Sequence, residues 1–198
     1  HLLDIDDYQF YDIFFGLSED AQCSLIRMAN RKGEFFRLDK FHYDEIENIG
    51  FAIDELLDAG FITLDNSQDP IIFSQFTKAE LHKLFPENGF NKKYKEEILI
   101  ELLESAKQID YQHLLSKYSI AKILVQDHIE FLKLLYFGNT HSMMTEFVIR
   151  DVGNIQLENL ENHQFTSWFS SRSEALAVFE LSRWNTAIKM AFETYMPD

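Results

Sequence analysis

The 198-residue chain is poor in the residues that stop helices or cross-link chains: it has 1 cysteine, 7 glycines and 3 prolines. The single cysteine, Cys23, excludes a disulfide within the chain and any zinc site built on cysteines, and it fits a reducing compartment. A β-sandwich needs turn residues about every 8–12 positions, and they are not present. With 19 phenylalanines and 46% hydrophobic residues, the chain instead favours a mainly α, well-packed protein.

Long hydrophobic runs are also missing. No run approaches the roughly 18 apolar residues of a membrane-spanning helix, and the most apolar stretch, 129–137, is interrupted by Glu130 and Lys133. The sequence therefore predicts no membrane association. It carries no secretory signal, and because it begins at His1 rather than Met we expect an excised fragment or a tag remnant.

Basic residues are outnumbered, with 18 Lys and Arg against 33 Asp and Glu and a net charge of −15. This balance alone argues against nucleic acid as a partner. One segment departs from this balance, because positions 27–42 contain five basic residues and only two acidic ones, Glu34 and Asp39. The basic residues are Arg27, Arg31, Lys32, Arg37 and Lys40. These cations either contact phosphates or merely balance the negative end of a helix dipole.

The spacing of apolar residues predicts the secondary structure of the first 75 residues. After a short helix or arm, it predicts a helix, an extended segment, two short helices and a hairpin, over residues 18–32, 34–38, 43–49, 51–59 and 61–73. In the hairpin, 71–73 pairs back on 61–64. This order is that of a winged helix-turn-helix, so residues 1–75 are predicted to be a winged-helix-like DNA-binding part.

The remainder is predicted to be helical. Thr77 and Glu80 have the spacing of a capping box, which begins a helix over 77–85. With a second helix over 92–107, residues 76–110 are predicted to form a helix-loop-helix. Residues 111–198 are predicted to be a helical linker with longer helices, over 117–137, 142–151 and 173–194.

No catalytic centre is recognisable. The chain lacks a glycine-rich phosphate loop and a nucleophile elbow, and no two histidines are three to five residues apart. Nucleases of the restriction-enzyme type place an acid before Glu-x-Lys to hold a divalent cation, and no such arrangement occurs here. We therefore predict no catalytic residue, metal or cofactor in this chain.

Three stretches resemble one protein family. They are 17–61, 76–85 and 134–159, and the most specific patterns are Arg-Lys-Gly-x-x-Phe-Arg-x-x-Lys-x-x-Tyr-x-Glu-Ile at 31–46 and Phe-Gly-Asn-x-x-x-x-x-x-Glu-Phe-Val at 137–148. They resemble the N-terminal half of the bacterial Fanconi-anaemia-associated nucleases, the VRR-NUC structure-specific nucleases. The resemblance covers roughly residues 8–185.

The resemblance implies a DNA-binding region followed by a helical linker to helical repeats. It also implies that a C-terminal nuclease domain, which cleaves 5′-flap and crosslinked DNA with Mg²⁺ or Mn²⁺, lies outside this sequence. The implied partner is branched, nicked or flapped DNA in the bacterial cytoplasm, at the nucleoid. Residues 76–99 also resemble a SAP helix-loop-helix, although Tyr94 stands where SAP motifs usually have Gly. The lysines of this region join the candidate phosphate contacts: Lys78, Lys83, Lys92, Lys93 and Lys95.

The third helix of a winged helix-turn-helix normally lies in the major groove. Here its predicted outward residues are the acids Asp54, Glu55 and Asp58, which repel phosphates. We therefore expect this helix not to read bases, and the contacts to come from the end of the first helix and the strand that follows it. The alternative is an acidic helical module that binds a protein partner through this face and does not bind DNA.

Overall fold

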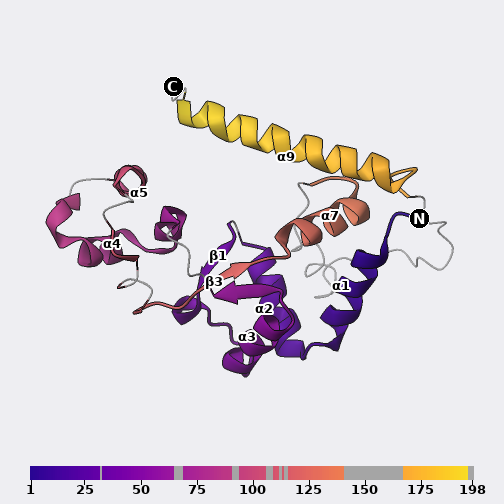
Figure 1. Ribbon diagram of the computed structural model, residues 1–198, viewed down its shortest axis with the longest axis horizontal. Coiled ribbons are helices and arrows are strands. Elements are labelled where there is room, and N and C mark those ends of the chain that lie inside the picture. The colour runs from indigo at the N-terminus through magenta and orange to yellow at the C-terminus, as the bar shows by residue number, and fades with distance from the viewer. Residues whose placement is uncertain are drawn as a thin grey trace. The chain divides into compact units, whose positions relative to one another are not determined.

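The computed structural model describes residues 1–31, 33–64, 69–90, 94–105, 109–111, 113, 116–140 and 167–195 (Figure 1). The chain divides into two compact units. One contains residues 17–124, and the other combines residues 1–16 with residues 125–198.

Two packed helices form the first part of the 17–124 unit. Helix α2 spans Glu19–Ala29 and helix α3 spans Ile49–Asp58. The Ser18 side chain accepts a hydrogen bond from the N–H of Ala21, and Asn48 caps α3 in the same way, so both helices begin at a polar cap. Leu25 of α2 and Leu56 of α3 have no solvent exposure, because the two helices bury their apolar sides against their neighbours.

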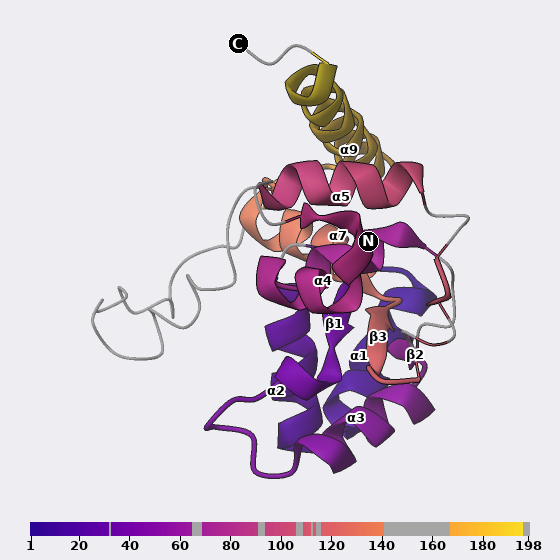
Figure 2. The ribbon, with the colours of Figure 1, turned by 90° about the vertical axis from the view of Figure 1, so that its left-hand side faces the viewer.

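A three-stranded antiparallel sheet completes this helix pair. Strands β1 (Phe35–Arg37) and β2 (Ile62–Leu64) both pair with β3 (Ile120–Ile123), which lies between them (Figure 2). Phe36 lies opposite Ala121 on one side of β3, and Leu64 lies opposite the same residue on the other. The central strand therefore comes from a segment far along the chain.

A helix-loop-helix lies between β2 and β3 in sequence. The short helix η2 (Pro70–Gln75) precedes α4 (Lys78–Leu84), and the turn η3 (Pro86–Asn88) leads towards α5 (Lys95–Glu104). Gly89 ends η3 with a φ of 62°, a left-handed conformation that glycine adopts without strain. The buried residues form one core with the sheet: Phe35, Ile72, Phe73, Phe76, Leu81, Phe90, Ile98, Leu102, Tyr111 and Ile120.

The other unit is helical in its described part. It contains α1 (Ile5–Gly16), α7 (Gln126–Phe137) and α9 (Arg172–Tyr195). Helices α7 and α9 run side by side (Figure 1) and share a small core of Phe131, Leu134, Phe169, Ala175 and Phe179. Beyond Phe179, the helix α9 exposes large apolar residues, including Leu181 and Trp184.

The structure confirms the mainly α fold class and the helix-turn-helix at the N-terminal end. The capping box of Thr77 and Glu80 is also present. Among the described helices, none is long and apolar enough to cross a membrane.

Three local predictions were wrong. Residues 71–73 belong to η2 and do not form a strand, because Asp69 caps this turn through the N–H of Ile71 and Pro70 starts it. Residues 43–48 form turns instead of a short helix, and α3 begins at Ile49. The predicted helix over 117–137 is interrupted, because 120–123 form the central strand and α7 starts at Gln126.

Other predictions concern boundaries or undescribed segments. The predicted helix over 142–151 lies outside the described residues. The predicted borders at residues 75 and 110 do not coincide with the two compact units, since β3 lies beyond the second border and pairs with strands before the first.

Candidate nucleic-acid interface

Two cations, one in the last turn of α2 and one just beyond its C-terminal end, lie over a single aromatic ring. The guanidinium carbons of Arg27 and Arg31 lie 4.9 Å and 5.6 Å from the centre of the Tyr43 ring. Arg27 also donates to Oε1 of Glu45, from Nε at 2.7 Å and from Nη2. Both arginines are exposed, so this end of α2 has the charge and access that a phosphate contact needs.

The segment that carries Tyr43 is fixed at both ends. Phe41 is buried and packs edge-on against the Tyr43 ring, with their centres 5.0 Å apart. Further on, Ile46 is buried, and the carboxylate of Asp20 accepts the N–H groups of Glu47 and Asn48 at 3.3 and 2.8 Å. The position of the Tyr43 ring relative to α2 is therefore set by the core and by the start of α2.

Arg37 is placed differently from the other predicted contacts. Its side chain is only 3% exposed, and its guanidinium lies 4.4 Å from the centre of the Phe76 ring and 4.6 Å from that of Tyr118. It also pairs with Asp39 and with Glu80 of α4. The structure therefore gives Arg37 a structural position joining β1 to α4, and it removes this residue from the candidate surface.

Glu80 combines this ion pair with the capping box. Its Oε2 accepts from the N–H and the hydroxyl of Thr77, while Oε1 lies 2.9 Å from Arg37 Nη1 and 3.5 Å from Lys40 Nζ. Burial alone raises the pKa of Glu80, but the hydrogen bonds from Thr77 and the guanidinium of Arg37 outweigh it and lower the pKa to about 2. Glu80 is therefore charged at neutral pH and neutralises part of the local positive charge.

The remaining predicted lysines are not all available. Lys40 and Lys83 are exposed and Lys78 is half-buried, so these three remain candidates. Lys95 donates from Nζ to the carbonyl oxygen of Ser74 at 2.9 Å and thereby ties α5 to η2. The other three predicted positions, Lys32, Lys92 and Lys93, lie outside the described residues. The basic segment thus forms two groups, one around Tyr43 and one around Glu80.

Helix α3 has the acidic outer side that its sequence predicts. Asp54 and Asp58 are exposed, whereas Ile53 and Leu56 are buried. Glu55 is half-buried and accepts a hydrogen bond from the Ser18 hydroxyl, which links the start of α2 to the C-terminal half of α3. The exposed side of α3 is therefore unsuited to phosphates.

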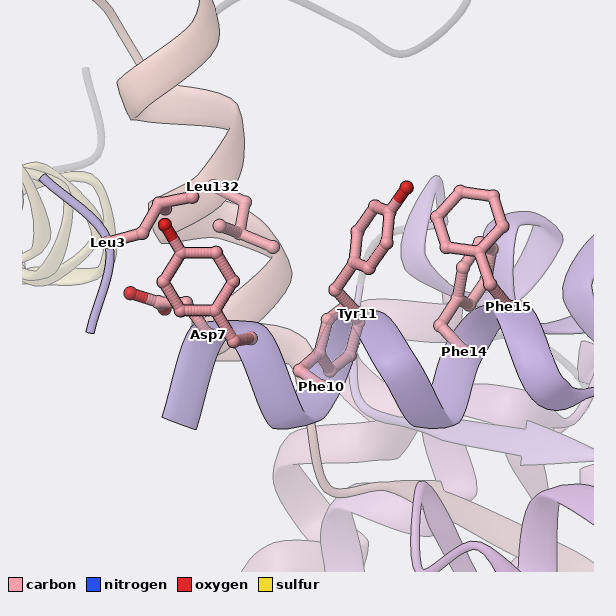
Figure 3. A pocket seen from close by; sticks show the side chains of 8 residues that line it. Leu3, Asp7, Phe10, Tyr11, Phe14, Phe15 and Leu132 are labelled. Carbon is pink, nitrogen blue, oxygen red and sulfur yellow. The ribbon is translucent and has the colours of Figure 1, made fainter. Parts of the chain in front are cut away.

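A separate apolar pocket of about 370 Å³ lies along α1. Figure 3 shows the rings of Tyr11 and Phe15 on one side of this helix, with Leu3 and Leu132 together near its start. Asp7 is buried beside the pocket, where it pairs with Arg172 of α9 and lies 3.3 Å from Nε2 of His128. This polar cluster holds the three helices of the unit together.

No metal site is formed by the described part of the chain, which contains no group of three or more His, Cys, Asp or Glu side chains able to hold an ion. The family resemblance implies Mg²⁺ or Mn²⁺ in a nuclease domain outside this sequence, and no chemical step is assigned to the described residues.

The packed helices α2 and α3, followed by β2, define a helix-turn-helix domain. Residues 1–63 match the family model described as "FAN1, HTH domain". Across the chain, the Fanconi-associated nuclease 1 homolog of Pseudomonas aeruginosa is 30% identical over 191 residues, covering 91% of this chain and 33% of the relative. The Arabidopsis thaliana homolog is 28% identical over 196 residues, covering 91% of this chain and 22% of the relative.

Solved structures give the same result. A crystal structure of paFAN1 bound to 2nt 5′flap DNA with gap covers 96% of this chain and 36% of that one, at 26% identity and a TM-score of 0.81. A second paFAN1 structure, with 1nt 5′flap DNA with gap, gives a TM-score of 0.77 at 26% identity. The chain belongs to the Fanconi-associated nuclease family and corresponds to its N-terminal region, spanning about a third of the length of the bacterial relative.

Two residues of this interface were not singled out from the sequence. Tyr43 and Glu45 lie in the motif at 31–46, but nothing in their spacing from Arg27 shows that the turn after η1 (Leu38–Lys40) returns the chain to the end of α2. The sequence gives one local signal for this arrangement. It is an aromatic residue followed two positions later by an acid, downstream of a helix that ends in basic residues.

Proposed function

We propose that this chain is the DNA-binding part of a structure-specific nuclease, and that it binds backbone phosphates of a duplex next to a nick or flap. The observation that carries the proposal is the likeness, over 96% of the chain, to a protein crystallised with gapped 5′-flap DNA. Contacts to phosphates fix position without reading sequence, which suits a protein that recognises the shape of a branched substrate.

The exposed cations supply the chemistry for such contacts. Arg27 and Arg31 at the end of α2, with Lys40 beside α4, are accessible, and the planar guanidinium groups suit phosphate oxygens. The exposed acids of α3 argue against a role for this helix as a major-groove reader. The net charge of −15 further limits binding to the local basic groups.

The test is fluorescence anisotropy of the 198-residue chain on a gapped duplex with a short 5′ flap and on plain duplex, at several salt concentrations. With about four phosphate contacts, log affinity should fall against log salt with a slope of roughly −3 to −4. Arg31→Glu should reduce the slope by about 1 and lower the affinity on all sequences alike.

The matched control is Lys189→Glu, which makes the same change of charge at an exposed position of α9. It should change binding less than Arg31→Glu does. Arg37 does not serve in this test, because its side chain is buried and a reversal there disturbs the fold. If the chain shows no binding at low salt, the DNA-binding proposal is wrong and the acidic protein-interaction module takes its place.

A further inference from the structure

The group at the end of α2 contains an acid in the position that a phosphate would need. Glu45 Oε1 accepts from Nε of Arg27 at 2.7 Å and contacts Nη2 of the same guanidinium. Arginine binds phosphate through paired N–H donors of the same guanidinium, in a bidentate contact. The Glu45 carboxylate thus occupies the donors that a DNA backbone would use.

The aromatic ring that supports these donors is already in position without a ligand. Tyr43 lies under both Arg27 and Arg31, and Phe41 holds the Tyr43 ring from the core. The ring attracts both cations through its negative face, which limits the positions that the guanidinium groups sample. Arg31 has no carboxylate within ion-pair distance among the described residues, so Arg27 and Arg31 together hold more positive charge than Glu45 neutralises.

We infer that Arg27, Arg31 and Tyr43 form a site for one backbone phosphate of DNA, and that Glu45 is an internal competitor which the phosphate displaces. The inference rests on the proposed DNA-binding function and adds the residues that set its strength. Glu45 discriminates against weakly binding anions, because a ligand must first replace the contact between Glu45 and Arg27. A ligand gains the additional attraction of Arg31 only if it contacts both arginines.

The displacement is feasible because the pair is exposed. The side chains of Arg27 and Glu45 are 50% and 42% exposed, and solvent screens ion pairs of this kind strongly. Glu45 stays charged at neutral pH, since a hydrogen bond from its own backbone and the hydrogen bond from Arg27 both lower its pKa. A phosphate that contacts two guanidinium groups replaces a carboxylate that contacts one.

The experiment is a double-mutant cycle on the 198-residue chain, measured by anisotropy with the gapped 5′-flap duplex. Glu45→Gln should tighten binding by about two- to fivefold, the range expected when an exposed ion pair no longer competes. In an Arg27→Gln background, the same Glu45→Gln change should give no gain, because its target is absent. Glu47→Gln is the control, since Glu47 is exposed, lies two residues away and removes the same charge.

The outcomes separate the two proposals. The role of Glu45 as a competitor is supported if Glu45→Gln raises DNA affinity more than Glu47→Gln does, and if this gain in affinity disappears in the Arg27→Gln background. If wild type binds but both glutamate variants gain equally, or if the gain persists without Arg27, the inference is overturned while the DNA-binding function stands. If neither wild type nor Glu45→Gln binds at low salt, both are overturned.

Discussion

Arg37 Nη1 lies 2.9 Å from Oε1 of Glu80, and this ion pair joins strand β1 to helix α4. The two residues are 43 positions apart in the sequence, in what were predicted to be a winged-helix part and a separate helix-loop-helix. The contact, together with the shared core of Phe35 and Phe76, makes the two predicted parts one folded unit.

Replacing Arg37 should therefore cost stability. Arg37→Ala leaves Glu80 and Asp39 without their partner and removes the guanidinium from between Phe76 and Tyr118, so we expect a loss of about 3 kcal/mol in the free energy of unfolding. Lys40→Ala is the control, because Lys40 is 59% exposed and only 3.5 Å from the same carboxylate, and it should cost less than about 1 kcal/mol. Urea denaturation of both variants compares them, and equal losses would contradict a structural role for Arg37.

Glu80 should make the stability of this unit depend on acidic pH. Its pKa is about 2 in the folded protein against 4.5 for an ordinary glutamate, so the unfolded chain takes up the proton first as pH falls. The contribution is complete above pH 4.5 and is lost as pH falls through about 2, with a total of about 2–3 kcal/mol. Glu80→Gln should lose this amount at pH 7 and show a flatter stability curve between these pH values, measured by denaturation at each pH. An unchanged slope would show that Glu80 is not the group responsible.

Asp7 should be as important to the other unit. Its buried carboxylate accepts the N–H of Asp4 at 2.8 Å, pairs with Arg172 and lies beside His128. Asp7→Asn weakens these contacts within a buried cluster, so we expect a loss of about 2 kcal/mol or more. Asp6→Asn, on the exposed side of the first turn of α1, should be nearly neutral. Thermal denaturation distinguishes them, and equal melting temperatures would mean that the cluster contributes little.

Gly138 supplies a test of a different kind. It ends α7 with a φ of 74°, and a Cβ built on it would lie 2.6 Å from a ring carbon of Trp168. Gly138→Ala is strained by its backbone and also displaces the Trp168 ring, so it should cost about 1–2 kcal/mol or more. At Gly16 an added Cβ meets nothing within 4 Å, and Gly16→Ala should be tolerated. Tryptophan fluorescence during denaturation measures the stability of both variants. A Gly138→Ala variant as stable as the wild type would contradict this packing.

The sequence predicted local structure well where the signal lies within one helix. The Ser18 cap and the capping box of Thr77 are defined by residues three apart, and both are present. The central strand could not be found in this way, because Ile120 and Ile123 are buried by pairing with β1 and β2, which lie far away in the sequence. Their apolar spacing is equally compatible with a helix that continues into α7.

The candidate site was predictable only in part. The cations at 27–40 are visible as a cluster in the sequence, but only the tertiary structure separates them into buried and exposed members. Arg37 is buried because Glu80 and the rings of Phe76 and Tyr118 surround it, and none of these is close in sequence. Charge counts alone therefore overestimate the binding surface.

The acidic side of α3 gives the last prediction. Asp54 and Asp58 are exposed and repel phosphates that approach this helix, so Asp54→Lys with Asp58→Lys should strengthen DNA binding on all sequences and steepen its salt dependence. The control is the double variant Asp12→Lys with Glu180→Lys, which replaces exposed acids of α1 and α9 and changes the net charge by the same amount. Because screening confines electrostatic effects to within about 10 Å of a charge at 0.1 M salt, the α3 pair should have the larger effect if DNA lies against the helix-turn-helix. Anisotropy at about 0.1 M salt makes this comparison, and equal gains from the two pairs would place the DNA away from α3.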